Sequence, residues 1–170
     1  MNIVYYGGRQ SGVVGLLTLM ALGHKVVCVV PVDDPVESVA LAHGLNVQKP
    51  KNVNLDEFVD YLDGLGADLF VCCHGRQIIK ARLLNRYKAI NVHPCLYKYK
   101  GADPISRVLA DGEKRISVAV HWMTEFVDRG ETIVELFKER ENDTVIGVYK
   151  ELYPLYSRSL VEALKIIERT

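Results

Sequence analysis

The sequence predicts an α/β fold in which a mostly parallel central sheet has helices on both faces, and three runs of residues support this prediction. A short apolar run at residues 2–6 is followed by a glycine-rich segment at 7–12 and an apolar helix at 13–22, which together make the first unit of a doubly wound sheet. Residues 68–73 are apolar enough for a central strand that is buried on both faces. Residues 88–92 form a further strand, which leads into alternating polar and apolar residues.

The remaining elements follow from capping and turn residues. Asp33 or Asp34 is expected to cap a helix that contains Pro35 in its first turn, and Asn54 is expected to cap the next one. An acidic residue after the second strand could also bind a ribose, but capping is the favoured interpretation. We expect further strands at 25–30, 46–48, 117–121 and 132–137, and helices at 35–43, 55–62, from 80 onward, at 104–110, after a Thr144 cap, and from Pro154 to the end of the chain.

The glycine-rich segment between the first strand and the first helix has two interpretations. Backbone N–H groups at a helix N-terminus can bind an anion. The glycines can equally well serve only to make a tight turn. The spacing of Gly8, Gly12 and Gly15 fits neither the dinucleotide fingerprint nor a P-loop, which disfavours a nicotinamide-dependent oxidoreductase.

Composition limits the classes of function. The 170 residues suit one domain, and Lys plus Arg equals Asp plus Glu at 21 each, so no net field attracts nucleic acid or membrane. No run of roughly eighteen apolar residues is present, and Met1 leads directly into a strand, so we expect no membrane segment and no leader peptide. The four cysteines are too few for a disulfide scaffold, which favours a cytoplasmic location. The His and Cys spacings match no zinc site, so no metal is expected.

Three polar residues suggest the chemistry. Asn91 and His93 point to one face of a strand that ends at Pro94, and Asp128 lies in an Asp-Arg-Gly turn between two later strands. We predict that the amide, the imidazole and the carboxylate meet, a combination suited to acyl transfer. Each residue alone would more often have a structural role. A nucleophilic Cys95 beside His93 is a less favoured alternative.

The ordered motifs resemble the signature of folate-dependent formyltransferases. The resemblance rests on Asn91-Val92-His93-Pro94, Leu96, Gly101, Pro104-Ile105, Gly112, the Val-x-Val-His strand and Val127-Asp128-x-Gly130. This family includes enzymes that act on methionyl-tRNA, on glycinamide ribonucleotide and on nucleotide sugars. The resemblance implies a Rossmann-like formyltransferase fold and a single catalytic domain over residues 1–170, without a C-terminal accessory domain.

The resemblance also implies roles for individual residues. Asn91 and a protonated His93 would stabilise the oxyanion, Asp128 would accept the proton of the amine, and His121 would be a supporting strand residue. The formyl donor would be 10-formyltetrahydrofolate, held by Gly75, Arg76, Ile78, Ile79 and Val127. The acceptor would lie beside Gly8, Arg9, Gln10, Ser11, Lys100 and Gly101.

The predicted function is therefore formyl transfer from 10-formyltetrahydrofolate to a primary amine of a small acceptor, phosphorylated or a nucleotide sugar. The residues at 95–98 and 124–126, together with Arg129, depart from the family pattern, which leaves the acceptor open. The alternatives are a methionyl-tRNA formyltransferase-like enzyme without its C-terminal domain, a 10-formyltetrahydrofolate hydrolase, and a non-catalytic folate- or nucleotide-binding module. The balanced charge disfavours tRNA, and the resemblance leaves a homodimer open.

Overall fold

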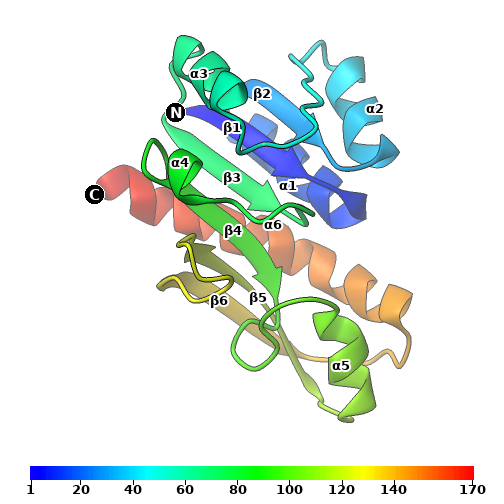
Figure 1. The fold of residues 1–170 in the computed structure, drawn as a ribbon. Helices are drawn as coiled ribbons and strands as arrows, with labels where there is room; N and C mark the ends of the chain where they lie inside the picture. Colours follow the sequence, from blue (N-terminus) through cyan, green and yellow to red (C-terminus); the bar gives the residue numbers. More distant parts are fainter.

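A six-stranded sheet runs through the centre of the computed structural model, which describes residues 1–170, and helices lie on both of its faces (Figure 1). The strand order is β2-β1-β3-β4-β5-β6; β1 to β4 are parallel, and β5 runs antiparallel to both β4 and β6. The strands are β1 (Asn2–Gly7), β2 (Lys25–Pro31), β3 (Leu69–Cys73), β4 (Lys88–Pro94), β5 (Arg115–Trp122) and β6 (Thr132–Glu139). The helices are α1 (Arg9–Ala21), α2 (Asp34–Ala42), α3 (Asp56–Gly64), α4 (Ala81–Leu84), α5 (Pro104–Ala110) and α6 (Val145–Arg169). The predicted α/β fold with a mostly parallel sheet is confirmed.

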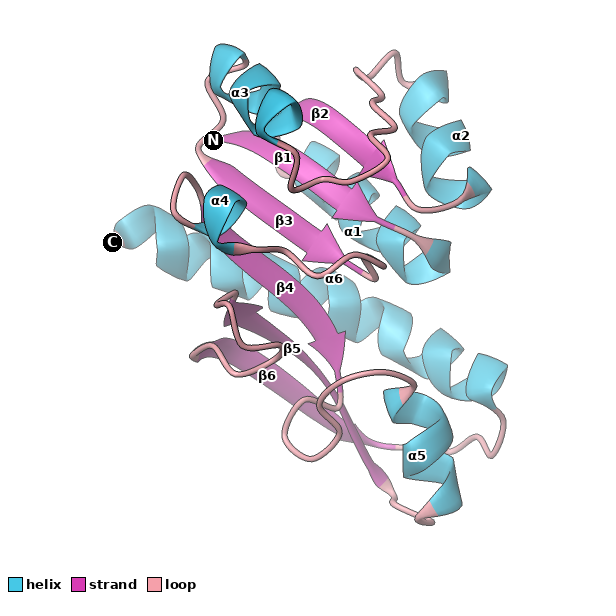
Figure 2. Cartoon of the chain, viewed as in Figure 1, coloured by secondary structure: helices cyan, strands magenta, loops and turns pink.

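The two faces of the sheet are covered unequally. On one face, α1, α2, α5 and α6 share a core of 28 buried residues with the strands. On the other face, α3 and α4 cover a core of only 14 buried residues, which extends on β4 only as far as Ala89. The second half of β4 is therefore left without a covering helix on this face (Figure 2).

Strand register places a row of side chains on that less covered face. Ile90 and Val92 point into the larger core, so Asn91 and His93 point to the opposite side. Asn91 pairs with Cys72 of β3 on one side and with His121 of β5 on the other. These side chains lie next to one another across three strands.

Several sequence expectations about short strands and caps are wrong. Residues 46–48 form only an isolated bridge between Val29 and Val47, so they are not a full strand. Asn54 does not cap α3; its side chain accepts a hydrogen bond from the backbone of Lys80 at 2.7 Å and donates to the carbonyl of Ile78 at 2.9 Å. Asp33 precedes α2 but makes no capping bond within that helix. For Asn54 and Asp33, a side-chain contact with a distant segment replaces the expected cap.

The two helices expected after Thr144 form one continuous helix, α6. Thr144 caps it as predicted, accepting a hydrogen bond from the backbone N–H of Gly147 at 3.0 Å. Pro154 lies inside the helix and does not end it. Its ring is on the exposed side, while Leu152 and Leu155 on either side are buried, so packing against the sheet outweighs the lost hydrogen bond.

The first helix also differs from the prediction, because α1 begins at Arg9 rather than at residue 13.

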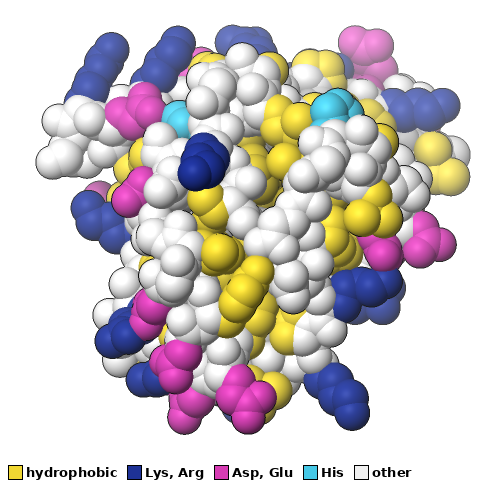
Figure 3. Space-filling view, turned by 90° about the horizontal axis from the view of Figure 1, so that it is seen from above, with side chains coloured by type: hydrophobic (Ala, Val, Ile, Leu, Met, Phe, Trp, Pro, Cys, Tyr) yellow, Lys and Arg dark blue, Asp and Glu magenta, His cyan; other side chains and the backbone are white.

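On the face of the molecule seen in Figure 3, neither sign of charge dominates. Seen from above Figure 1, Lys and Arg are interspersed with Asp and Glu around a central strip of apolar side chains (Figure 3). Helices of the length and apolar character needed to cross a membrane are absent.

Replacing Gly130 tests a close approach that shapes the β5–β6 loop. A Cβ atom at this position would lie 1.7 Å from the carbonyl oxygen of Trp122, so an added methyl group forces the loop to move. We expect Gly130→Ala to lower the free energy of unfolding by roughly 2 kcal/mol or more, measured by urea denaturation.

Gly64→Ala is the matched control, because no atom lies within 4 Å of a Cβ built at this position at the end of α3. We expect it to leave stability unchanged or to raise it slightly, since alanine has the higher helix propensity. Equal unfolding free energies for the two variants would contradict the close approach.

Candidate active site

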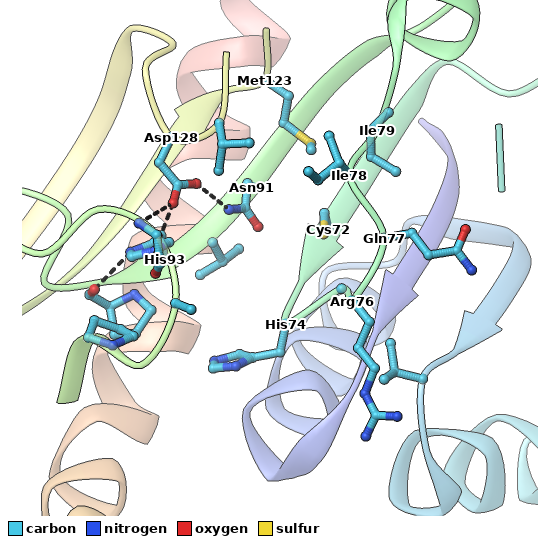
Figure 4. A pocket seen from close by; sticks show the side chains of 18 of the residues that line it. Cys72, His74, Arg76, Gln77, Ile78, Ile79, Asn91, His93, Met123 and Asp128 are labelled. Carbon is cyan, nitrogen blue, oxygen red and sulfur yellow. Dashed lines mark hydrogen bonds and ion pairs between the residues drawn. The ribbon is translucent and has the colours of Figure 1, made fainter. Parts of the chain in front are cut away.

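A cleft of about 380 Å³ opens on the less covered face of the sheet. Five parts of the chain provide most of its lining: the start of α1, the segment just before α2, the loop after β3, the end of β4 with the following loop, and the β5–β6 loop. Tyr149 of α6 closes one end. Figure 4 shows Asn91, His93 and Asp128 facing one another inside this cleft.

Asp128 reaches the cleft by a route that the sequence does not reveal. Because β5 is antiparallel to β4, the loop after β5 starts beside the first half of β4, where the backbone N–H of Met123 donates to the carbonyl of Ala89 at 2.8 Å. The loop then folds back across the face of the sheet. Asp128 therefore lies above the face of the sheet, while His93 lies at the carboxyl end of β4.

His93 contacts only hydrogen-bond acceptors. Its Nδ1 lies 2.8 Å from the carbonyl oxygen of Pro94, and its Nε2 lies 3.1 Å from Asp128 Oδ2 and 3.2 Å from the carbonyl oxygen of Gly101. Both ring nitrogens can act as donors only in the imidazolium form. The surroundings of His93 thus match the charged ring.

Asp128 is the centre of the polar cluster. Its Oδ2 also accepts a hydrogen bond from the backbone N–H of Gly101 at 2.8 Å, while its Oδ1 lies 3.5 Å from Asn91 Nδ2 and 3.6 Å from His121 Nε2. Burial alone would raise the pKa of this carboxyl. The hydrogen bonds from His121 and His93 outweigh burial and hold its pKa well below the ordinary value. Asp128 is therefore ionised across the neutral range.

His121 belongs to this cluster, although the sequence interpretation gave it only a supporting place. Its side chain is buried, and its Nδ1 lies 2.8 Å from the carbonyl oxygen of Trp122. Its Nε2 lies 3.3 Å from Asn91 Nδ2 and 3.6 Å from Asp128 Oδ1, so the ring contacts both the amide and the carboxylate of the cluster. The alternation Ser-x-Ala-x-His in the sequence predicts that His121 shares a strand face with Ser117 and Ala119, and the register of β5 against β4 brings this face beside Asn91.

Strained backbone is concentrated around the cleft. Five residues other than glycine have a positive φ, and four of them line the cleft: Arg9, His74, Asp103 and Asp128. Such conformations cost energy and persist where the surrounding contacts enforce them. This clustering independently marks the cleft as a functional site.

One end of the cleft is apolar. Ile78, Ile79 and Met123 gather there, and Val127 from the β5–β6 loop also lines the cleft (Figure 4). Ile78 is 60% exposed and Val127 is 51% exposed, which is unusual for such side chains and fits a surface that a flat apolar ligand would cover.

The loop after β3 is held firmly in place. The backbone N–H groups of Arg76 and Gln77 both donate to the hydroxyl of Tyr6 at 2.9 Å. A Cβ atom at Gly75 would lie 2.4 Å from the ring of Tyr6, so only glycine fits there. These contacts leave the side chains of this loop, rather than those two N–H groups, to contact a ligand.

The other end of the cleft is polar and contains His74. Burial, together with the charges of Arg9 and His93, lowers the pKa of His74 to about 4, so the ring is neutral near pH 7. Its Nε2 lies 2.6 Å from the hydroxyl of Tyr156. Sequence reasoning missed this histidine because it follows an apolar strand without any motif.

Most of the predicted site residues line the cleft, and four do not. Those that do are Arg9, Gly75, Arg76, Ile78, Ile79, Asn91, His93, Gly101, Val127 and Asp128. Gly8, Gln10, Ser11 and Lys100 lie outside the lining, and Ser11 is buried in α1. Lining residues that sequence reasoning did not assign to the site include Asp33, Cys72, His74, Gln77, Asp103, His121, Met123 and Tyr149.

The cysteines show no sign of an activated thiol. Burial raises the pKa of Cys95 to about 11 and that of Cys72 to about 12, so both are protonated at neutral pH. No group of three or more His, Cys, Asp or Glu side chains is arranged to hold a metal ion.

The lowered pKa of Asp128 predicts a specific dependence of stability on pH. Its carboxyl binds a proton less readily in the folded than in the unfolded protein, where the ordinary pKa is 3.8. Its contribution to stability is therefore fully present above that value and is lost as the pH falls below it. We expect the difference in unfolding free energy between the native protein and Asp128→Asn to shrink from about pH 5 to about pH 2.

Urea unfolding at a series of pH values measures this difference. Asp34→Asn is the control, because the exposed Asp34 takes no part in the cluster and its variant should parallel the native curve. A difference between native and Asp128→Asn that stays constant over this range would contradict the assignment.

The sequence matches known proteins over most of its length. Residues 24–164 match the family model described as formyl transferase. A methionyl-tRNA formyltransferase from Heliobacterium modesticaldum is 34% identical, with 99% of this chain and 58% of that protein aligned. The bifunctional polymyxin resistance protein ArnA from Wigglesworthia glossinidia brevipalpis is 32% identical, with 89% of this chain and 25% of that protein aligned. The chain thus spans between a quarter and three fifths of these relatives.

Solved structures share the fold. The phosphoribosylglycinamide formyltransferase from Campylobacter jejuni superposes with a TM-score of 0.83 at 22% identity, covering 98% of this chain and 97% of that one. A formyltetrahydrofolate deformylase from Pseudomonas syringae superposes with a TM-score of 0.82 at 20% identity, covering 96% of this chain and 59% of that one. At these identities the likeness concerns the fold.

Proposed function

The chain belongs to the formyl transferase family, and from this premise we propose that it transfers a formyl group from 10-formyltetrahydrofolate to a primary amine of a small acceptor. The observation that supports the proposal is that Asn91, His93 and Asp128 meet in one cleft. His93 Nε2 lies 3.1 Å and Asn91 Nδ2 lies 3.5 Å from the nearest carboxylate oxygen of Asp128. These residues provide an amide donor, an imidazole donor and an ionised carboxylate, as acyl transfer requires.

In this proposal the folate occupies the apolar end of the cleft. The exposed side chains of Ile78 and Val127 cover the flat pteridine ring, and Met123 and Ile79 complete the wall. Arg76 is exposed on the same loop and is available to the negatively charged glutamate tail. The formyl carbon then lies beside Asn91, at the boundary between the apolar and the polar end.

The reaction proceeds through a tetrahedral intermediate. The neutral amine attacks the formyl carbon, a new C–N bond forms, and the carbonyl oxygen becomes an oxyanion that accepts hydrogen bonds from Asn91 Nδ2 and His93. The amine loses a proton, the bond from carbon to N10 breaks, and N10 takes up a proton. Asp128 accepts the proton from the amine, directly or through a water, and its lowered pKa means that it passes the proton on rather than keeping it.

His121 acts through Asn91 in this mechanism. Its contact at 3.3 Å holds the Asn91 amide in the cluster, and Asn91 Nδ2 turns from its longer bond to Asp128 Oδ1, at 3.5 Å, to donate to the oxyanion. The polar end of the cleft, with Arg9, His74 and Tyr149, then receives the acceptor. The buried, free cysteines fit a reducing cytoplasm as the location.

Kinetic measurements on site variants test the proposal. Release of tetrahydrofolate from 10-formyltetrahydrofolate is followed in the presence of a panel of primary amines. Removing an oxyanion donor costs about 3–4 kcal/mol, so we expect Asn91→Ala and His93→Ala to lower kcat at least about a hundredfold. The KM for the folate should change little, because neither side chain belongs to the apolar end.

His43→Ala is the matched control for the histidine variant, since His43 is exposed at the end of α2. It should retain native activity. Equal rates for His93→Ala and the native protein would contradict the mechanism. Release of tetrahydrofolate at the same rate without any amine would identify a hydrolase instead of a transferase.

A further inference from the structure

Gly101 contacts two groups of the active site through its backbone. Its N–H donates to Asp128 Oδ2 at 2.8 Å, and its carbonyl oxygen lies 3.2 Å from His93 Nε2. Its φ is +84°, a conformation that glycine adopts without strain. Lys100 and Asp103 on either side are exposed, so little packing holds this part of the loop. A contact from outside the loop is therefore needed to fix the Gly101 backbone.

Arg107 of α5, the helix that follows this loop, supplies such a contact (Figure 1). Its Nη2 donates to the carbonyl oxygen of Lys100 at 2.6 Å. This carbonyl and the N–H of Gly101 belong to the same peptide group, and a trans peptide directs its oxygen and its N–H to opposite sides. The guanidinium of Arg107 and the carboxylate of Asp128 thus lie at the two ends of one peptide group.

The guanidinium of Arg107 has no other polar partner. Arg107 takes part in no ion pair, and its buried Nε has no hydrogen-bond partner. Its guanidinium carbon also lies 5.7 Å from the centre of the Tyr99 ring. Packing on Tyr99 and the bond to Lys100 are therefore the two roles that the structure leaves for this side chain.

A cation at one end of a peptide group and an anion at the other strengthen both hydrogen bonds. Each bond has one charged member, and charged hydrogen bonds are roughly twice as strong as neutral ones. Bonds in such a chain also polarise one another, because the effective dielectric constant inside a protein is low. Burial raises the pKa of Asp128, while the hydrogen bonds from His121, His93 and Gly101 lower it. Arg107 acts on the last of these bonds.

We propose that Arg107 is a positioning residue of this active site: through the Lys100–Gly101 peptide it holds the Asp128 carboxylate in place for the acceptor amine. Arg107 does not touch the reacting atoms, since it lies outside the lining of the cleft. Its effect on the rate rests on the proposed formyl transfer. Its effect on the carboxylate does not, so the two effects are measured separately.

A double-mutant cycle on stability tests the effect on the carboxylate without any substrate. Urea unfolding at neutral pH compares the native protein, Arg107→Met, Asp128→Asn and the double variant. Methionine keeps an apolar stem on Tyr99 and removes the donor and the charge. We expect the factor by which Asp128→Asn changes the folding equilibrium constant to be at least about fivefold smaller in the Arg107→Met background than in the native protein. Packing on Tyr99 alone predicts equal factors, and equal factors would overturn the proposal.

Arg158→Met is the matched control, because it removes the same charge from an exposed position on α6. We expect Asp128→Asn to have the same effect in this background as in the native protein. Arg107→Gln removes the charge with a second side chain, and it takes the place of Arg107→Met in the cycle if that variant does not fold.

Kinetic measurements with 10-formyltetrahydrofolate and the panel of primary amines test the effect on the rate. We expect Arg107→Met to lower kcat about tenfold and to leave the KM for the folate unchanged, because the carboxylate loses its orientation while the apolar end stays intact. Arg107→Lys keeps the charge and should recover most of this loss. A native kcat in Arg107→Met would overturn the proposal. Absence of turnover by the native protein would contradict the proposed function and leave the cycle on stability to decide the role of Arg107.

Discussion

The buried carboxylate of Asp128 is the interaction on which the site depends. A buried carboxylate is stable only if hydrogen bonds replace the water it has lost, and here the backbone N–H of Gly101 and the ring of His93 contact one oxygen, while Asn91 and His121 approach the other. These partners come from three separate parts of the chain. The carboxylate therefore fixes the loop after β4 and the loop after β5 relative to each other.

The cleft exists because the helices cover the two faces of the sheet unequally. The larger core anchors β4 from one side through Ile90 and Val92, while the smaller core ends at Ala89 on the other side. The same strand thus supplies core residues and site residues at alternate positions. An antiparallel β5 completes the arrangement, since it brings His121 opposite Asn91 and sends the following loop back across the open face.

The sequence predicts those features that depend on local periodicity. Alternation in β4 predicts that Asn91 and His93 share a face, and apolar runs predict the central strands. It does not predict features in which a distant contact replaces a local preference. Asp33 contacts Arg9 rather than capping its own helix, and Pro154 remains within α6 because its neighbours are buried against the sheet. The contact of His121 with Asn91 likewise depends on strand register, which one sequence alone does not define.

Binding of the folate to the apolar end of the cleft is the most direct test of the proposed reaction. Calorimetry with 5-formyltetrahydrofolate, a stable analogue of the donor, would compare the native protein with Ile78→Glu and with the control Ile166→Glu, which changes an exposed residue on α6. We expect micromolar binding to the native protein and to the control, weakened at least about tenfold in Ile78→Glu because the added charge is desolvated. Absence of binding to the folded native protein, or unchanged affinity in Ile78→Glu, would contradict a folate site in this cleft.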